Sequence, residues 1–223
     1  MSNKATIWIS FIIITILIAA GLVLLPQLPD QVPSHWNDQG QVDGYSSKLS
    51  GVLLMPGILL ATLLLLLVVP SIDPRKANIA KFRPQYNVFI LCFVLFLAYL
   101  HVLTLMAGLG VKIDMNRMLM PAFGLFFIFV GSMVRHAKRN YMIGIRTPWT
   151  LHSDYVWDKT HQVGGIAFMI AGAFTMLTVF IPQLAFPVMM TSVLLVAVGT
   201  IIYSYFVYRQ LEKNSSSADN SNT

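Results

Sequence analysis

Two loops of this chain carry most of the side chains that could do chemistry, and the first of them is rich in carboxylates. His35 lies near Asp30, Asp38 and Asp43 there, and histidine with carboxylates can bind a metal ion. Their spacing follows no regular ligand pattern. Aspartates that cap turns and a histidine bonded to a carbonyl fit it better. We therefore predict no metal site and no bound cofactor.

The second chemically rich loop, residues 135–162, contains His161 and Arg146. His161 could act as a general base while Arg146 holds an anionic group, which would suit a membrane-embedded enzyme acting on a lipid or peptide at the cytoplasmic face. No HExxH, GxSxG or phosphate-loop motif accompanies them. His136, His152 and His161 lie 16 and 9 residues apart, which forms no local metal clamp. We assign no catalytic residue and keep the enzyme as the alternative.

The elements that position these loops are apolar. Of the 223 residues, 56% are hydrophobic and 11% charged, whereas soluble domains carry about 25% charged residues. Six unbroken apolar runs approach the roughly 20 residues that cross a bilayer as a helix. They are residues 6–25, 51–70, 86–108, 118–134, 163–181 and 186–208. We predict an all-α polytopic membrane protein with six transmembrane helices, an ordered outward loop 1 and a cytoplasmic or re-entrant loop 4.

The predicted organisation has four parts. Residues 1–70 hold two helices and the outward loop 26–50, and residues 71–134 hold the third and fourth helices. Residues 135–208 hold the second chemically rich loop and the last two helices, and 209–223 form a Ser/Asn-rich tail that we expect to be disordered. The first apolar run is too long for a cleaved signal peptide, so we expect it to be retained.

The basic residues orient the chain. Twelve of the 15 Lys and Arg residues fall in the N-terminal segment, the second and fourth loops and the C-terminal segment. Because basic loops remain on the cytoplasmic side, both termini are predicted to be cytoplasmic. This orientation explains the net charge of +6 without a nucleic acid partner. No carboxylate lies within a span and no ATP site is visible, which disfavours a transporter.

The outward loop should be ordered. Pro29 and Pro33 stiffen its start, and the Asp43-Gly44 pair has turn chemistry, so a short pair of strands is expected. Trp36 and Tyr45 can pack on the membrane surface or on helix ends.

The fourth loop permits two interpretations. Gly144 allows a turn, Ser153 is a candidate N-cap for a helix that begins at Asp154, and Gly165 would let a neighbouring helix approach closely. An interfacial or re-entrant segment with a function would use Arg146, Trp149 and His161. Alternatively, basic residues with Trp149 and Trp157 form a belt in the lipid headgroup layer.

Both loops contain motifs of one family. The first, with Leu28-Pro29, Pro33, His35-Trp36-Asn37, Gly40 and Asp43-Gly44-Tyr45, resembles the small domain near the N-terminus of SdpI-type membrane proteins. The fourth resembles the SdpI signature through Asn140, Gly144-Ile145-Arg146-Thr147-Pro148-Trp149-Thr150, Ser153, Trp157, Thr160-His161 and Gly164-Gly165.

This resemblance implies an immunity protein of the bacterial plasma membrane that protects against a secreted toxin peptide. In such proteins the loaded form can also hold a cytoplasmic transcriptional repressor at the membrane. We expect the toxin to dock on the outward loop at His35, Trp36, Asn37, Asp43 and Tyr45. On the cytoplasmic side, the signature residues expected to matter are Asn140, Gly144, Arg146, Thr147, Pro148, Trp149, Trp157, His161 and Gly165.

Overall fold

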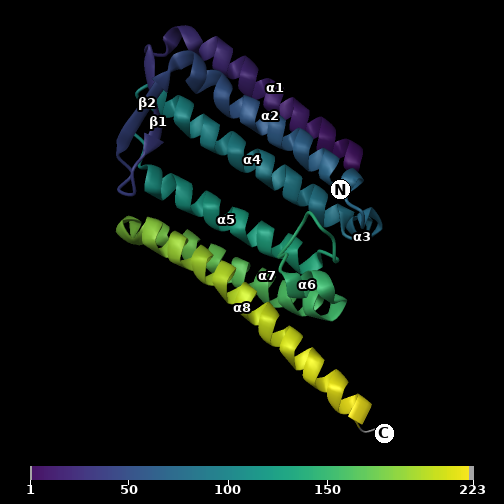
Figure 1. Cartoon of the computed structure of the whole chain (residues 1–223). Helices are drawn as coiled ribbons and strands as arrows, with labels where there is room; N and C mark the ends of the chain where they lie inside the picture. The colour runs from purple at the N-terminus through teal and green to yellow at the C-terminus, as the bar shows by residue number, and fades with distance from the viewer. Residues whose placement is uncertain (1, 221–223) are drawn as a thin grey trace.

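A computed structural model describes residues 2–220, and it contains six helices long and apolar enough to cross a membrane (Figure 1). They are α1 (Asn3–Leu24), α2 (Lys48–Ile72), α4 (Arg83–Gly108), α5 (Met115–His136), α7 (Asp154–Leu177) and α8 (Ala185–Asn220). Each corresponds to one predicted run. The all-α polytopic architecture is therefore confirmed.

All six helices begin earlier than the apolar runs, and polar side chains cap three of them, α1, α2 and α5. The hydroxyl of Ser47 accepts a hydrogen bond from the backbone N–H of Ser50 at the start of α2, at 3.2 Å. The carboxylate of Asp114 does the same for Arg117 in α5, at 3.1 Å. Such caps satisfy backbone donors that have no partner within the first turn.

Short elements join the long helices. The first loop holds strands β1 (Gln31–Trp36) and β2 (Val42–Ser47), which pair antiparallel, so the expected strand pair is confirmed. The remaining elements are α3 (Lys76–Ala80), α6 (Pro148–His152) and the 3₁₀ turns η1 (Leu25–Gln27), η2 (Thr178–Phe180) and η3 (Pro182–Leu184).

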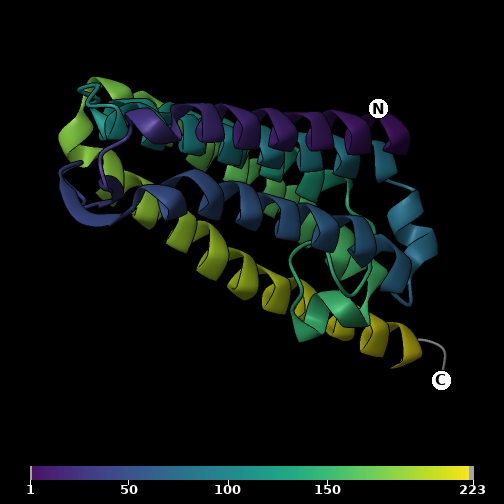
Figure 2. The ribbon, with the colours of Figure 1, turned by 90° about the horizontal axis from the view of Figure 1, so that it is seen from above.

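The long helices form two groups of three. Helices α1, α2 and α4 pack on one another around a core that includes Leu17, Leu59 and Val94. Helices α5, α7 and α8 form the second group, and α4 contacts α5 between the groups. Figure 2 shows α8 running obliquely to α1 and α2.

The crossing of α5 and α7 is the tightest contact, and glycine makes it possible. A Cβ on Gly131 would overlap the backbone oxygen of Gly165, and a Cβ on Gly124 would lie 2.5 Å from the backbone oxygen of Gly172. Absence of side chains here lets the two backbones meet directly. The predicted close approach at Gly165 is confirmed.

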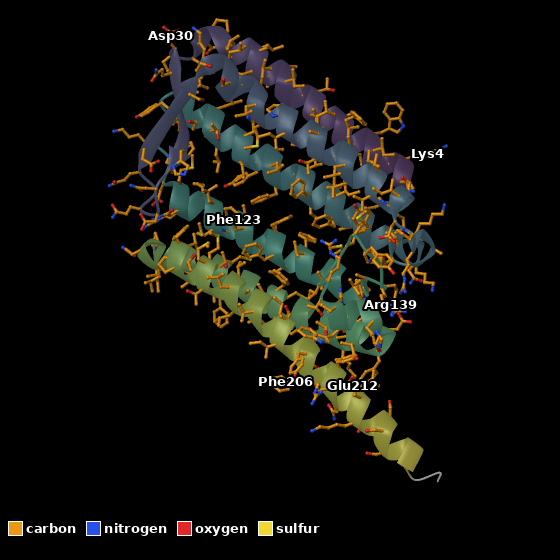
Figure 3. The ribbon with its side chains drawn as sticks, viewed as in Figure 1. Lys4, Asp30, Phe123, Arg139, Phe206 and Glu212 are labelled. Carbon is orange, nitrogen blue, oxygen red and sulfur yellow. The ribbon has the colours of Figure 1, made fainter. Side chains whose placement is uncertain are left out.

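The connecting segments alternate between the two ends of the bundle. The hairpin β1–β2, the α4–α5 link and the α7–α8 link lie at one end, called the hairpin end below (Figures 1 and 2). The N-terminus, α3, α6 and the end of α8 lie at the other. Figure 3 shows Asp30 at the hairpin end, and Lys4 and Arg139 at the opposite one.

The last segment differs from the expectation in its secondary structure. Disorder was expected over residues 209–223, whereas α8 continues to Asn220. Arg209 and Glu212 form an i,i+3 ion pair at 3.6 Å, and the serine hydroxyls bond back to carbonyls one turn earlier, as Ser215 does to Leu211 at 3.0 Å. These local contacts extend the helix beyond its apolar part. Residues 221–223 lie outside the described range.

Candidate functional site

Residues 137–153, between α5 and α7, form a compact structure that we call the signature loop. Asn140 organises its first half and is fully buried. Its side-chain oxygen accepts hydrogen bonds from the backbone N–H of Met142 and Ile143, at 2.9 and 2.6 Å, while its amide donates to the carbonyls of Lys138 and Ile143. One asparagine thus satisfies four backbone groups of a turn that has no regular ladder.

The segment after α2 anchors this turn from outside. The carboxylate of Asp73, which is 1% exposed, accepts from the backbone N–H of Tyr141 at 2.9 Å and from that of Arg75 at 2.6 Å. Asn78 in α3 donates to the carbonyl of Arg139 at 2.8 Å. The signature loop is therefore fixed to the first group of helices as well as to its own.

Arg139 connects the second half of the signature loop to the start of α7. Its guanidinium donates to the carbonyls of Leu151 and His152, the last residues of α6, at 3.2 and 2.8 Å. It also pairs with the carboxylate of Asp154 at 2.6 Å. This arrangement places a cation at the C-terminal end of α6 and a carboxylate in the first turn of α7, both of which match the helix dipoles.

His161 in α7 holds the middle of the signature loop through its imidazole ring. The ring of His161 stacks on the indole of Trp157 with centroids 3.9 Å apart, and Trp157 donates to the carbonyl of Ala137 at 2.8 Å. Nε2 of His161 accepts from the backbone N–H of Ile145 at 3.0 Å, and Nδ1 lies 2.8 Å from the carbonyl of Trp157. This network assigns the proton to Nδ1. Both ring nitrogens are engaged, so His161 has no free nitrogen to serve as a base in this conformation.

Gly144 makes the contact with His161 possible. Its φ of +113° lies where L side chains are strained, and a Cβ there would overlap Nε2 of His161. The turn predicted at Gly144 is confirmed.

Thr147 joins the loop to α8. Thr147 and Thr150 form a capping box at the start of α6, in which each side chain bonds the backbone N–H of the other. The hydroxyl of Thr147 also lies 3.0 Å from that of Ser204, and Thr147 and Ser204 are both buried.

Only part of the predicted set faces outward. Arg146 and Pro148 are exposed, and Trp149 is half-buried with its ring edge-on to Tyr205 at 5.2 Å. Arg146 donates to the carbonyl of Tyr141 at 2.7 Å. Trp157 is 0% exposed, because its indole is enclosed between His161 and the carbonyl of Ala137, so it does not fit the interpretation in which it joins a belt in the headgroup layer.

The hairpin end holds the other predicted residues and a cavity of about 510 Å³. The cavity lies between the hairpin and the α4–α5 link. Pro33, Trp36, Gly40 and Val42 line it from the hairpin, Ala107 from the end of α4, and residues 110–114 from the link. Asn116 in α5 donates to the carbonyl of Asp38 at 3.0 Å, so the hairpin tip is tied to the second group of helices.

Trp36 is the one residue of the predicted docking set that lines this cavity. His35 is instead exposed and pairs with Asp43 across the strands at 2.5 Å. Asn37 forms the turn, because its side-chain oxygen accepts from the backbone N–H of Gln41 at 2.9 Å. Tyr45 is exposed on β2. Among the described residues, no group of three or more His, Cys, Asp or Glu residues could hold a metal ion.

Comparison with known proteins finds a match for the signature loop and another for the hairpin. A family model described as the SdpI/YfhL protein family matches residues 136–204, and one described as a domain of unknown function, DUF1648, matches residues 12–60. Immunity protein SdpI of Bacillus subtilis (strain 168) is 26% identical over 204 residues, which cover 91% of this chain and 96% of that protein. Residues 136–204 of this chain therefore resemble the SdpI/YfhL protein family, as the signature residues predicted. No solved structure matches it significantly.

The region matched by the SdpI/YfhL model contains the signature loop, α7 and most of α8. The DUF1648 region contains most of α1, the hairpin and half of α2. Three residues of the site were missed from the sequence: Asp73, Arg139 and Ser204. Asp73 gave a weak signal, as a carboxylate directly after an apolar run. Ser204 gave none, since it lies 57 residues from its partner.

Proposed function

We propose that this protein is a membrane immunity protein that protects its cell against a secreted antimicrobial peptide. The observation that carries the proposal is the end-to-end similarity to an immunity protein, together with a cavity at the hairpin end that includes Trp36. The toxin is an amphipathic peptide that inserts apolar side chains beside Trp36.

The cavity suits a peptide that must be sensed by both helix groups. One wall is the hairpin, which connects α1 to α2 of the first group. The other is the α4–α5 link, which leads into α5 of the second group. A ligand that binds one arrangement of these walls better than another shifts the packing of the two groups. Helix α5 then runs from this cavity to the signature loop at the opposite end.

Replacing Trp36 by alanine tests the docking proposal. Cells producing the Trp36→Ala protein at equal membrane abundance should lose protection, because the largest apolar surface in the cavity is removed. Tyr45→Ala is the matched control, because Tyr45 is the other aromatic residue of the hairpin but does not line the cavity. Unchanged protection in Trp36→Ala cells would mean that the peptide binds elsewhere.

The proposal requires the hairpin outside and both termini in the cytoplasm. Ser34 on β1 and Ser217 near the end of α8 are exposed and suit single cysteine substitutions in a Cys92→Ser background. A membrane-impermeant maleimide should label Ser34→Cys in intact cells and Ser217→Cys only after permeabilisation. The reverse pattern would invert the orientation and remove the docking site from the outer face.

Holding a repressor is the second part of the proposal. Arg146 and Pro148 are the exposed members of the predicted signature set, and Lys138 is a further exposed basic residue of the signature loop. We propose that toxin binding changes the exposure of this surface to a cytoplasmic repressor. Arg146→Ala should abolish induction of immunity while leaving protection intact, as read by a reporter and by survival. Equal loss of both would contradict a separate signalling surface.

A further inference from the structure

A groove between α4 and α5 lies outside both regions described so far. It has a volume of about 620 Å³ and a largely apolar lining, in which the one charged residue, Arg117, lies at the rim. Phe96 and Phe126 line it, and their rings stack with centroids 4.8 Å apart. Phe123, which is not part of the lining, meets Phe96 edge-on at 4.9 Å. Figure 3 labels Phe123 on α5, where this helix faces α4.

The groove has the depth of one leaflet. Its α5 wall extends from Arg117 to Phe129, 12 positions along the helix. At 1.5 Å per residue this is about 18 Å, close to half of the roughly 30 Å hydrocarbon core. Arg117 lies in the first turn of α5, at the hairpin end, so the groove descends from the membrane surface into one leaflet.

The rim has a free cationic face. Nε of Arg117 pairs with the carboxylate of Asp114 at 3.2 Å, and the side chain of Arg117 is 60% exposed. The terminal nitrogens of Arg117 make no hydrogen bond to another described residue. Guanidinium nitrogens of this kind bind phosphate in pairs.

We propose that this groove binds one phospholipid of the leaflet at the hairpin end. An acyl chain lies on Phe96 and Phe126, and the phosphate contacts Arg117. Length, apolar lining and a single cation at surface depth together match that chemistry. Because the lipid would contact α4 and α5 at once, it would fill the seam between the two helix groups.

Lipid retention provides the test. Protein released from vesicles of equal parts phosphatidylglycerol and phosphatidylcholine should carry one tightly held phospholipid in native mass spectrometry. Ala122→Phe fills the groove and should abolish that species, and Arg117→Gln should reduce it several-fold. Ala197→Phe, an equal substitution at an exposed position of α8, is the matched control and should keep the lipid.

Cys92 lines the groove and is the single cysteine of the chain, so it reports occupancy directly. In lipid-stripped detergent, added phosphatidylglycerol should slow the reaction of Cys92 with N-ethylmaleimide several-fold in the unmodified protein and less in Arg117→Gln. Equal retention in Ala122→Phe and Ala197→Phe would overturn the proposal. The proposal would also be overturned if added phospholipid left the rate of the Cys92 reaction unchanged. The same holds if a dimer, and not a lipid, proved to protect Cys92.

Discussion

The hydrogen bond from Ile145 to His161 offers the sharpest test of how the signature loop is held. His161→Phe keeps an aromatic ring of similar size on the indole of Trp157 but removes the acceptor of the Ile145 N–H. A buried donor that loses its partner costs about 1–3 kcal/mol. The helices themselves should remain, because no capping contact of α5 or α7 involves the imidazole.

This cost can be measured as local opening. Hydrogen exchange of an amide follows the population of the open form, and about 1.4 kcal/mol corresponds to a factor of ten. The segment 140–147 in His161→Phe should therefore exchange about 5 to 150 times faster than in the unmodified protein. Exchange measured by mass spectrometry in detergent or nanodiscs gives this ratio.

The other buried histidine supplies the control. His101 in α4 is buried as completely as His161, but neither of its ring nitrogens has a hydrogen-bond partner among the described residues. His101→Phe should leave exchange over 140–147 unchanged. If His161→Phe exchanges at the unmodified rate in this segment, the imidazole does not hold the loop and the assignment of its role is refuted.

Three further predictions follow from the geometry. Gly144→Ala should lower the midpoint of thermal unfolding by several degrees, because it combines backbone strain of about 1–3 kcal/mol with a clash against the facing imidazole. Gly131→Leu should reduce folded protein in the membrane, measured by gel filtration in detergent, because α5 and α7 would be forced apart. Lys48→Gln should return the pKa of Asp30 toward its usual value, measured by NMR titration, since the hydrogen bond and charge of Lys48 now lower that pKa.

The two glycine predictions have control variants, and the ion-pair prediction fixes the direction in which stability changes with pH. Gly110 also has a positive φ, but a Cβ there would meet nothing within 4 Å, so Gly110→Ala should cost less than Gly144→Ala. Gly199 on α8 is open in the same way and should accept leucine. The Asp30–Lys48 pair stabilises the fold above the unfolded pKa of Asp30, and this contribution is lost as pH falls through the lower folded pKa. A rise in stability on acidification through that range would contradict the pairing.

Local signals in the sequence were enough for much of the signature loop. Gly144 predicted a turn, and Ser153 correctly marked the start of a helix at Asp154, although its hydroxyl makes no capping bond. These features depend on backbone preferences of single residues and their neighbours. They did not reveal that Asn140 and His161 hold the backbone of the loop, since that depends on the path of the chain between them.

The sequence by itself determined that lipid surrounds most of the chain and in which order the helices follow one another. Six apolar runs of bilayer length, separated by polar segments, allow one kind of fold because a helix satisfies its own backbone in lipid. Tertiary structure alone decided which signature residues are buried supports and which, such as Arg146, face outward. It also decided that Asp73 and Ser204 belong to the site and that α4 and α5 leave a groove between them. Such contacts join residues far apart in the chain, so no local pattern of hydrophobicity or turn chemistry encodes them.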